Sequence, residues 1–154
     1  MKDISIAIES PRQPSVIALI EALDKFHEIY PPEANHFLDI EGLCAPDVHL
    51  LVGRRAGAAI GIAALWIRRD FHLGEVKRMF VQPAARGSGL AESLLERIET
   101  IARENAIARL ALETGTLNVA AHKLYEGAGF ARCGPFADYP EAPFSVFMEK
   151  RLEL

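Results

Sequence analysis

A glycine turn between a predicted strand and a predicted helix is the feature that most constrains this chain. The strand-like run 75–81 ends at Pro83, and a turn of small residues that includes Gly87 and Gly89 follows it. Apolar residues at helical spacing begin directly after the turn. Because glycine carries no Cβ, such a turn can present several backbone N–H groups to one ligand, and the helix adds unpaired N–H groups and the positive end of its dipole. With the charge of Arg86, the segment predicts a site for a phosphate or diphosphate group.

The composition indicates one globular domain with no nucleic-acid or membrane role. The chain has 154 residues, of which 50% are hydrophobic and 25% charged, so we expect a single domain over 1–154 with a sizeable core. The net charge of −4 gives no basic surface for a nucleic acid. No apolar run approaches the ~18 residues of a membrane span, and the first residues show no signal-peptide pattern. Cys44 and Cys133 are too few and too distant for a disulfide framework or a metal knuckle, so we expect a cytoplasmic protein.

The hydrophobic periodicity predicts a mixed sheet with helices packed on its faces, which is the α/β (α+β) class. Alternating or apolar runs predict strands at 4–8, 49–54, 58–68, 74–81, 107–113, 130–133 and 144–150. Helical spacing predicts helices from Pro14 to the Pro31-Pro32 pair, over 90–104 and over 118–127. Residues 33–47 are expected to be irregular or briefly helical, and 55–57 to form a hairpin turn.

Three classes of ligand use a glycine turn before a helix, and the residues here fit one of them. A P-loop requires a lysine followed by Ser or Thr, and the turn has no lysine. A dinucleotide fingerprint requires glycine or alanine where Glu92 stands, within a βαβ unit, whereas a hairpin precedes this strand. The remaining pattern, Arg/Gln-x-x-Gly-x-Gly/Ala, is met by Arg86, Gly89 and Ala91. It resembles motif A of the GNAT superfamily of N-acetyltransferases, which binds the pyrophosphate of acetyl-coenzyme A.

The residues on both sides of this pattern extend the resemblance. The strand 75–83 is similar to the strand that leads into motif A, and 112–115 with 118–130 is similar to the second motif of the family. The resemblance covers 49–134 closely, and the tail 136–150 looks like a branch of small bacterial members. It implies a GNAT fold, which is a mostly antiparallel sheet of six to seven strands, splayed between the fourth and fifth strands and flanked by about four helices.

The resemblance also implies acetyl-coenzyme A as the co-substrate and a position for each part of it. The diphosphate would lie on the backbone of the turn, and the pantetheine arm would bond to the fourth strand. Asn118 would either reach the cofactor or only cap the last helix. The cofactor-binding residues expected on this basis are Met79, Phe80, Val81, Arg86, Gly87, Ser88, Gly89, Leu90, Ala91 and Asn118.

Acetyl transfer to an amine requires two proton transfers, and the chain offers a residue for each. The amine must lose a proton, and the departing thiolate must gain one. Tyr125 matches the family's tyrosine and is the expected acid, since a phenol with an ordinary pKa of about 10 stays protonated near neutral pH. Glu75 is the expected base, acting through a water molecule, with His72 in reserve. Both could instead be structural, with Tyr125 packed on the sheet and Glu75 solvated at a strand start.

The acceptor side depends on two segments that wall the acceptor pocket in this family and on the end of the fifth strand. The expected substrate-binding residues are His36, Asp39, Glu113, Asp138 and Tyr139, all of which could also be ordinary surface polar residues. Their carboxylates, with those of Glu41 and Glu75, would suit a cationic amine. Lys77 and Arg78 are expected on a solvated face, or one of them near the cofactor phosphates. No histidine–carboxylate group has metal-ligand spacing, so no metal is expected.

These observations predict an acetyl-coenzyme A-dependent N-acetyltransferase that acts on a primary amine of a small molecule or peptide by direct attack. A non-catalytic module that binds or senses acyl-coenzyme A on the same fold is the alternative, and the presence of both Tyr125 and Glu75 favours the enzyme. Transfer to oxygen, or of a longer acyl group, would use the same turn and leave no mark in the sequence. The apolar last strand is compatible with a homodimer.

Overall fold

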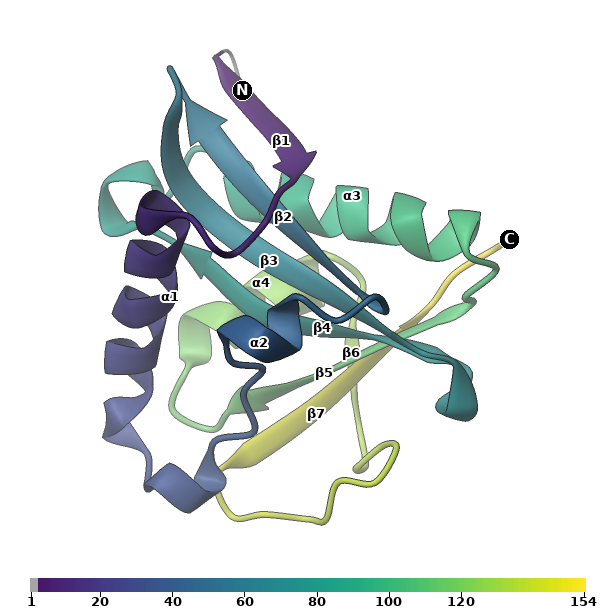
Figure 1. Ribbon diagram of the computed structural model, residues 1–154. Coiled ribbons are helices and arrows are strands. Elements are labelled where there is room, and N and C mark those ends of the chain that lie inside the picture. The colour runs from purple at the N-terminus through teal and green to yellow at the C-terminus, as the bar shows by residue number, and fades with distance from the viewer. Residues whose placement is uncertain (1–2) are drawn as a thin grey trace.

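The computed structural model describes residues 3–154, which fold around one seven-stranded sheet (Figure 1). The strands lie in the order β1-β2-β3-β4-β5-β7-β6, and within this range β4 and β5 form the one parallel pair. Their bounds are β1 Ile4–Ile8, β2 Val48–Arg55, β3 Ala58–Arg68, β4 Leu73–Val81, β5 Arg109–Gly115, β6 Ala131–Cys133 and β7 Ser145–Arg151. The expected α/β class and the mostly antiparallel sheet are confirmed.

Helices cover both faces of the sheet. The helices α1 (Pro14–Phe26) and α2 (Ile40–Leu43) lie on one face, and α3 (Leu90–Glu104) and α4 (Val119–Gly127) lie on the other (Figure 1). Short 3-10 helices occupy connections, namely η1 (His27–Ile29), η2 (Pro32–Ala34), η3 (Arg69–Phe71) and η4 (Pro83–Ala85). None of the helices in residues 3–154 has the length and apolar character needed to cross a bilayer.

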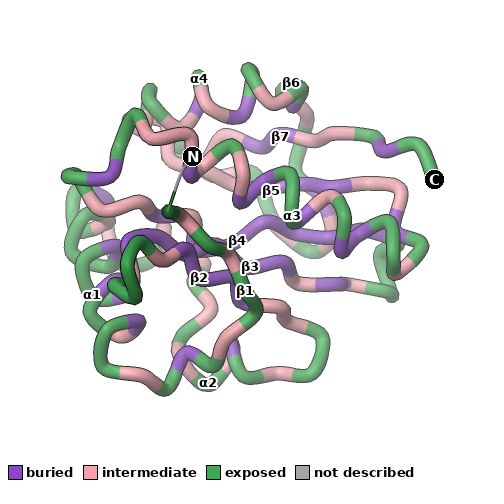
Figure 2. Tube along the Cα trace, turned by 90° about the horizontal axis from the view of Figure 1, so that it is seen from above, coloured by how far each residue is buried: buried purple, intermediate pink, exposed green. Residues whose placement is uncertain are grey.

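Two apolar clusters hold these helices to the sheet. In one, Leu94 and Ile98 of α3 pack with Leu65 and Leu112 of the sheet, and in the other Leu19 of α1 packs on β2 and β3. Buried residues gather along the central strands, while the loops and the outer faces of the helices are exposed (Figure 2). Each fully buried leucine or isoleucine contributes about 1.5–3 kcal/mol relative to an exposed one, so these stripes fix the helices in place.

The sheet opens between β4 and β5. Pairing between these strands joins three residues of β4 to three of β5, namely Gly74 to Leu110, Glu75 to Ala111 and Val76 to Leu112. In the described structure no residue of β4 after Val76 pairs with β5. The expected splay between the fourth and fifth strands is therefore present, and it begins just after Val76.

A β-bulge in β4 lies at the start of the split. Lys77 is opposite Ala64 of β3 and Phe80 is opposite Ile62, so the register passes over the two residues between them. Arg78 has a φ of 56°, which a side-chain-bearing residue rarely adopts. Such bulges redirect side chains and are frequent next to functional sites.

The observed strand bounds lie within one residue of the expected ones, except in β5, which is shifted by two residues. The strand β5 begins at Arg109 rather than at 107, because the backbone N–H of Ile107 donates to the carbonyl oxygen of Ala102 (2.8 Å) and closes the end of α3. Ile107 is nevertheless part of the core, which explains why the apolar pattern includes it. The strand β7 continues to Arg151, which pairs with Arg109.

Candidate active site

The turn between β4 and α3 forms a cradle of open backbone N–H groups. Gly87 and Gly89 have φ angles of 80° and 86°, which glycine adopts without strain. The N–H groups that make no hydrogen bond to another residue of the described chain belong to Gly87, Gly89, Ala91 and Glu92. A Cβ at Gly87 would meet no atom within 4 Å, so the space in front of the turn is open. A ligand anion can therefore reach these donors.

Other N–H groups of the cradle are occupied by long hydrogen bonds that shape it. The N–H of Ser88 donates to the carbonyl oxygen of Ala85 (3.3 Å), and the N–H of Leu90 donates to the hydroxyl oxygen of Ser88 (3.3 Å). Nε of Arg86 donates to the carbonyl oxygen of Val81 (3.1 Å), at the exposed surface beside the turn. The turn therefore presents some of its backbone N–H groups, while the N–H groups of Ser88 and Leu90 are occupied.

Two facing glycines bring the cradle close to the sheet. Gly53 of β2 lies opposite Gly61 of β3, and a Cβ on either would come within 2.7 Å of a side-chain atom of Leu90. Leu90 is 1% exposed, so the first residue of α3 is anchored in the core beside the end of β4. The spacing of the turn residues alone does not predict this role. Glycine inside two apolar strands was the available signal, since it marks a close approach.

A cavity at the split continues the groove of the cradle. The groove, of about 360 Å³, runs along Met79, Phe80 and Val81 to the turn, and the cavity, of about 140 Å³, lies between β4 and β5. The residues that line both spaces are Leu23, Met79, Asn118, Ala121 and Leu124. A ligand held at the cradle can therefore extend along β4 into the cavity.

Tyr125 reaches this cavity from α4. It is 6% exposed, and its ring packs edge-on against Phe130, with the ring centroids 5.7 Å apart. Burial raises the pKa of Tyr125 above the ordinary value of 10, so its hydroxyl stays protonated at neutral pH. The contact with Phe130 fixes the direction of the ring.

Tyr30 holds the connection from β5 to α4, and the sequence pattern does not predict this contact. The hydroxyl oxygen of Tyr30 accepts a hydrogen bond from the N–H of Leu117 (3.0 Å), 87 positions away. Gly115 leaves room for this hydroxyl, because a Cβ there would overlap it. Asn118 then caps α4, with its Oδ1 accepting from the N–H of Ala121 (3.2 Å), and it also lines the cavity and the groove.

Glu75 lies in a buried network of charges where β4 and β5 are still paired. It is 0% exposed, and its two oxygens accept hydrogen bonds from Nη1 of Arg68 (3.0 Å) and from the hydroxyl of Tyr139 (2.8 Å). Nζ of Lys77 forms an ion pair with Oε2 of Glu75 at 3.1 Å. Burial and the neighbouring Glu75 raise the pKa of Tyr139, so Tyr139 remains a neutral donor. Glu75 does not line the cavity. The predicted base role is not favoured by these contacts.

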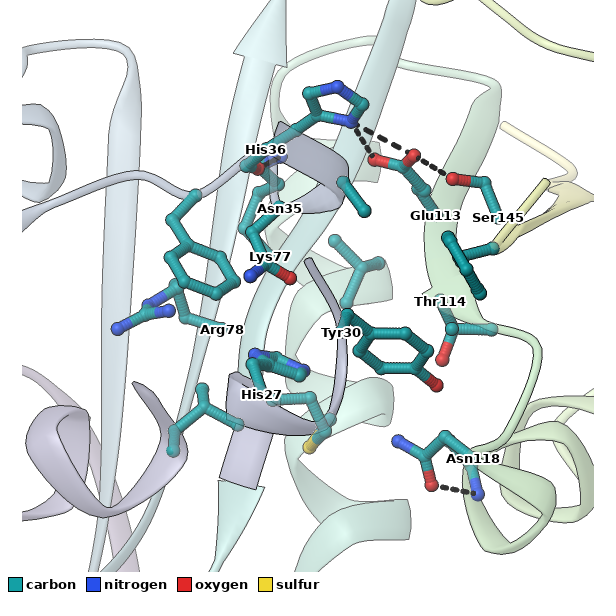
Figure 3. A pocket seen from close by; sticks show the side chains of 18 of the residues that line it. His27, Tyr30, Asn35, His36, Lys77, Arg78, Glu113, Thr114, Asn118 and Ser145 are labelled. Atoms are coloured by element: carbon teal, nitrogen blue, oxygen red, sulfur yellow. Dashed lines mark hydrogen bonds and ion pairs between the residues drawn. The ribbon is translucent and has the colours of Figure 1, made fainter. Parts of the chain in front are cut away.

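His36 and Glu113 meet at the opposite side of the split. Nδ1 of His36 lies 2.9 Å from Oε1 and 3.0 Å from Oε2 of Glu113, and the hydroxyl of Ser145 donates to Oε2 (2.6 Å). Figure 3 shows the three side chains together at one end of the cavity. The imidazole is 30% and the carboxylate 10% exposed, and both line the cavity. Two of the five expected substrate-binding residues therefore reach it.

The other three expected substrate-binding residues do not line the cavity. Asp39 caps α2 and accepts from a backbone N–H of that helix (2.8 Å). Asp138 is exposed and accepts from Nη2 of Arg68 (3.0 Å), which holds the pKa of Asp138 below its ordinary value. Tyr139 is bonded into the buried network. The expected convergence of carboxylates is therefore absent from the described cavity, whose lining includes Glu113 as its carboxylate.

Lys77, Arg78 and His27 line the cavity. The sequence predicted a solvated face for Lys77 and Arg78, and it predicted no role for His27. Lys77 and Arg78 are buried, and Arg78 pairs with Asp24 (2.5 Å) and lies over the ring of Phe37 at 4.7 Å. Nδ1 of His27 is buried without a hydrogen-bond partner among residues 3–154. Two adjacent cations inside an apolar strand were the available signal for Lys77 and Arg78. No group of three or more histidine, cysteine or acidic residues suited to a metal ion occurs in the described chain.

Comparison with known proteins identifies the family. Residues 16–130 match the model of the acetyltransferase (GNAT) family. The chain is 48% identical over 153 residues to the IAA acetyltransferase of Azospirillum brasilense, which covers 99% of this chain and 100% of that protein. A crystal structure assigned as an acyl-CoA N-acyltransferase of Klebsiella pneumoniae is 35% identical, with a TM-score of 0.82 over 97% of this chain and 98% of that one. The PaiA N-acetyltransferase of Thermoplasma acidophilum, solved with coenzyme A, shares the fold at 19% identity and a TM-score of 0.74, over 96% and 98% of the two chains.

The chain belongs to the acetyltransferase (GNAT) family, because the family model spans more than half of it and a full-length relative is nearly half identical. It is accordingly an acyltransferase. The resemblance inferred from the turn and the second motif is confirmed.

Proposed function

We propose that this protein moves the acetyl group of acetyl-coenzyme A onto a primary amine of a small molecule by direct attack. The observation that carries the proposal is the cavity at the split. The groove of the cradle enters it from one side, Tyr125 lines its wall, and the pair formed by His36 and Glu113 lies at its end. A thioester in this cavity would have a donor path, an acid and an acceptor side in one place.

The donor is proposed to bind along the groove. The open N–H groups of the turn, the start of α3 and the side chain of Arg86 suit the negative charges of a diphosphate. The pantetheine arm would then follow Met79, Phe80 and Val81, which line the groove. This path leads past Asn118 to the cavity, so the reactive sulfur would lie near Tyr125.

Tyr125 is proposed to protonate the departing thiolate. Its phenol keeps the proton at neutral pH because burial raises its pKa. The thiolate would form in the same cavity, where burial against the protein also raises its proton affinity. Transfer from the buried phenol to the buried thiolate therefore exchanges one desolvated anion for another. The base role predicted for Glu75 remains a prediction, and the three donors around that carboxylate speak against it.

The size of the cavity supports a small acceptor. A volume of about 140 Å³ is close to that of an apolar cavity that holds a benzene molecule. It suits a compact amine better than a peptide segment. We further propose a cytoplasmic location, since Cys44 and Cys133 are free thiols.

The test combines binding and turnover. Calorimetry with acetyl-coenzyme A should show saturable binding, and a thiol-release assay should show turnover with at least one amine of a panel. The panel contains small alkyl and aryl amines, amino acids, a lysine peptide, and IAA, the compound in the name of the 48% identical relative. Binding without thiol release on the whole panel would contradict the proposal and favour the sensing module. Release with the peptide alone would contradict the small acceptor.

A further inference from the structure

We propose that His36 is the group that takes the proton from the acceptor amine, and that Glu113 is the residue that positions it. The inference rests on the proposed function, because it concerns the acceptor side of the same cavity. It replaces Glu75 by a pair that lies where β4 and β5 have separated.

The contacts of His36 determine which of its nitrogens is free. Nδ1 lies within 3.0 Å of both oxygens of Glu113, and an ionised carboxylate can only accept hydrogen bonds. In the neutral imidazole Nδ1 must therefore carry the hydrogen, and Nε2 then keeps its lone pair. Nε2 makes no hydrogen bond to another residue of the described chain. This is the arrangement in which a carboxylate orients a histidine and leaves the second nitrogen available as a base.

Both edges of the split hold His36 in place. On the β4 side, Nζ of Lys77 donates to the carbonyl oxygen of His36 (2.6 Å), and Lys77 is itself bonded to Glu75 (3.1 Å) and to the hydroxyl of Tyr139 (3.1 Å). On the β5 side, Glu113 binds the imidazole. The charged or titratable groups that face the imidazole are therefore Glu113, Lys77 and Tyr139, whose ring centroid lies 5.3 Å from it. The buried network thus holds the segment that carries the base.

The proton and electron balance follows from these positions. The ammonium form of the acceptor gives one proton to Nε2 of His36, and Glu113 stabilises the imidazolium that results. The free amine attacks the thioester carbonyl, the C–N bond forms and the C–S bond breaks. The sulfur leaves with the proton of Tyr125, and Tyr125 regains one from the new amide nitrogen. The imidazolium releases its proton to solvent, so the net products are the amide, the free thiol and one proton.

The competing role for the pair is a latch that only ties residues 31–39 to β5. The substitution His36→Asn separates the two roles, because the side-chain N–H of asparagine takes the place of Nδ1 but no base remains at Nε2. His72, expected above as the reserve base, is exposed and lies outside the lining of the cavity, so it has no place in the site. His72→Asn is therefore the control, and asparagine tolerates its φ of 53°. Both variants should keep the melting temperature and the affinity for acetyl-coenzyme A.

We expect kcat of His36→Asn to fall about 10²–10⁴-fold and the acid limb of the pH profile of kcat/KM to disappear with it. Added imidazole should restore part of the rate of His36→Ala, while His72→Asn keeps the wild-type profile. A wild-type rate and profile in His36→Asn would overturn the base role and leave the proposed function intact. Absence of thiol release by the wild-type protein on every amine would overturn both.

A second measurement tests the positioning part without turnover. Long-range ¹H–¹⁵N spectra of the wild-type protein should show His36 with its hydrogen on Nδ1, and Glu113→Gln should weaken that preference and lower kcat about tenfold or more. A hydrogen on Nε2 in the wild-type protein would overturn the inference, because that nitrogen could not accept the proton of the amine.

Discussion

Glu75 and Glu113 are carboxylates on neighbouring strands, and they lie on opposite sides of the point where the sheet opens. Glu75 is level with Ala111, within the last three paired residues, whereas Glu113 lies two positions further along β5, beyond the pairing. Glu75 pairs with two cations, accepts a hydrogen bond from a phenol and has no exposure to solvent. Glu113 accepts from an imidazole and a hydroxyl and lines a cavity.

The environment of each carboxylate in this sheet therefore depends on whether β4 and β5 are paired beside it, and not on the residue type. Where β4 and β5 are joined, the charge of Glu75 has no access to water and must be neutralised by neighbours. Where the strands separate, a cavity replaces the partner strand, so Glu113 can hold a group that changes its protonation state during a reaction. Under the proposed function, the paired side around Glu75 is structural and the open side around Glu113 carries the chemistry.

The largest expected effect comes from removing one hydroxyl on the open side. We expect Tyr125→Phe to lower kcat about 10²–10⁴-fold, because the thiolate would leave without a proton donor. The melting temperature and the affinity for acetyl-coenzyme A should stay near the wild-type values, since the contact with Phe130 involves the ring rather than the hydroxyl. Steady-state kinetics at saturating acetyl-coenzyme A measure the first effect, and calorimetry measures the second. Unchanged turnover would remove the acid role and with it the chemical assignment of the open side.

The second prediction tests the paired side through stability. We expect Glu75→Gln to lower the free energy of unfolding by about 3–5 kcal/mol, because Arg68 and Lys77 would be left as buried cations without their shared anion. Urea unfolding followed by circular dichroism measures the loss. The matched control is Glu113→Gln, whose partner His36 is partly exposed to solvent, so its loss should be clearly smaller. If both variants lost the same free energy of unfolding, the proposed difference between the paired side and the open side would be wrong.

The sequence predicted the donor side far better than the acceptor side, and chain distance explains why. The cradle is formed by consecutive residues, and two glycines with one arginine specify both its conformation and its charge. The meeting of His36 with Glu113 joins residues 77 positions apart, and no local pattern encodes it. Glu75 looked solvated or catalytic because the sequence does not show that Arg68, Lys77 and Tyr139 surround it.

The third prediction tests where the acyl donor binds on the open side. Gly87 and Gly57 have φ angles of 80° and 84°, and a Cβ at either would meet no atom within 4 Å. Substitution by alanine should therefore cost both positions a similar strain, about 1–2 kcal/mol. We expect Gly87→Ala alone to weaken acetyl-coenzyme A binding, by about tenfold or more, because its methyl group would occupy the space in front of the open N–H groups. Calorimetry on both variants measures this, and equal affinities would contradict the placement of the diphosphate.

The smallest expected effect concerns the response to acid, which should arise on the open side because the charges around Glu75 are already paired. Burial, and then the charge of Arg78, lower the pKa of His27 below its ordinary value of 6.5. Above pH 6.5 the imidazole is neutral in the folded and unfolded chains, so its contribution to stability is complete. As the pH falls below 6.5 the unfolded chain binds the proton first, and stability is lost until the lower folded pKa is passed.

His27→Phe should remove this loss, since a phenyl ring can keep the stacking on Phe37, where the centroids lie 5.0 Å apart, and carries no proton. Urea unfolding at pH 7.5, 6.5 and 5.5 should show a flatter dependence for the variant, by at most about 1.4 kcal/mol per pH unit. His72→Asn serves as the control, because an exposed imidazole should leave the slope unchanged. If His27→Phe keeps the wild-type slope, the acid response has another source. In that case the burial of His27 does not lower the free energy of unfolding at acid pH. The open side would then be no more sensitive to acid than the paired side.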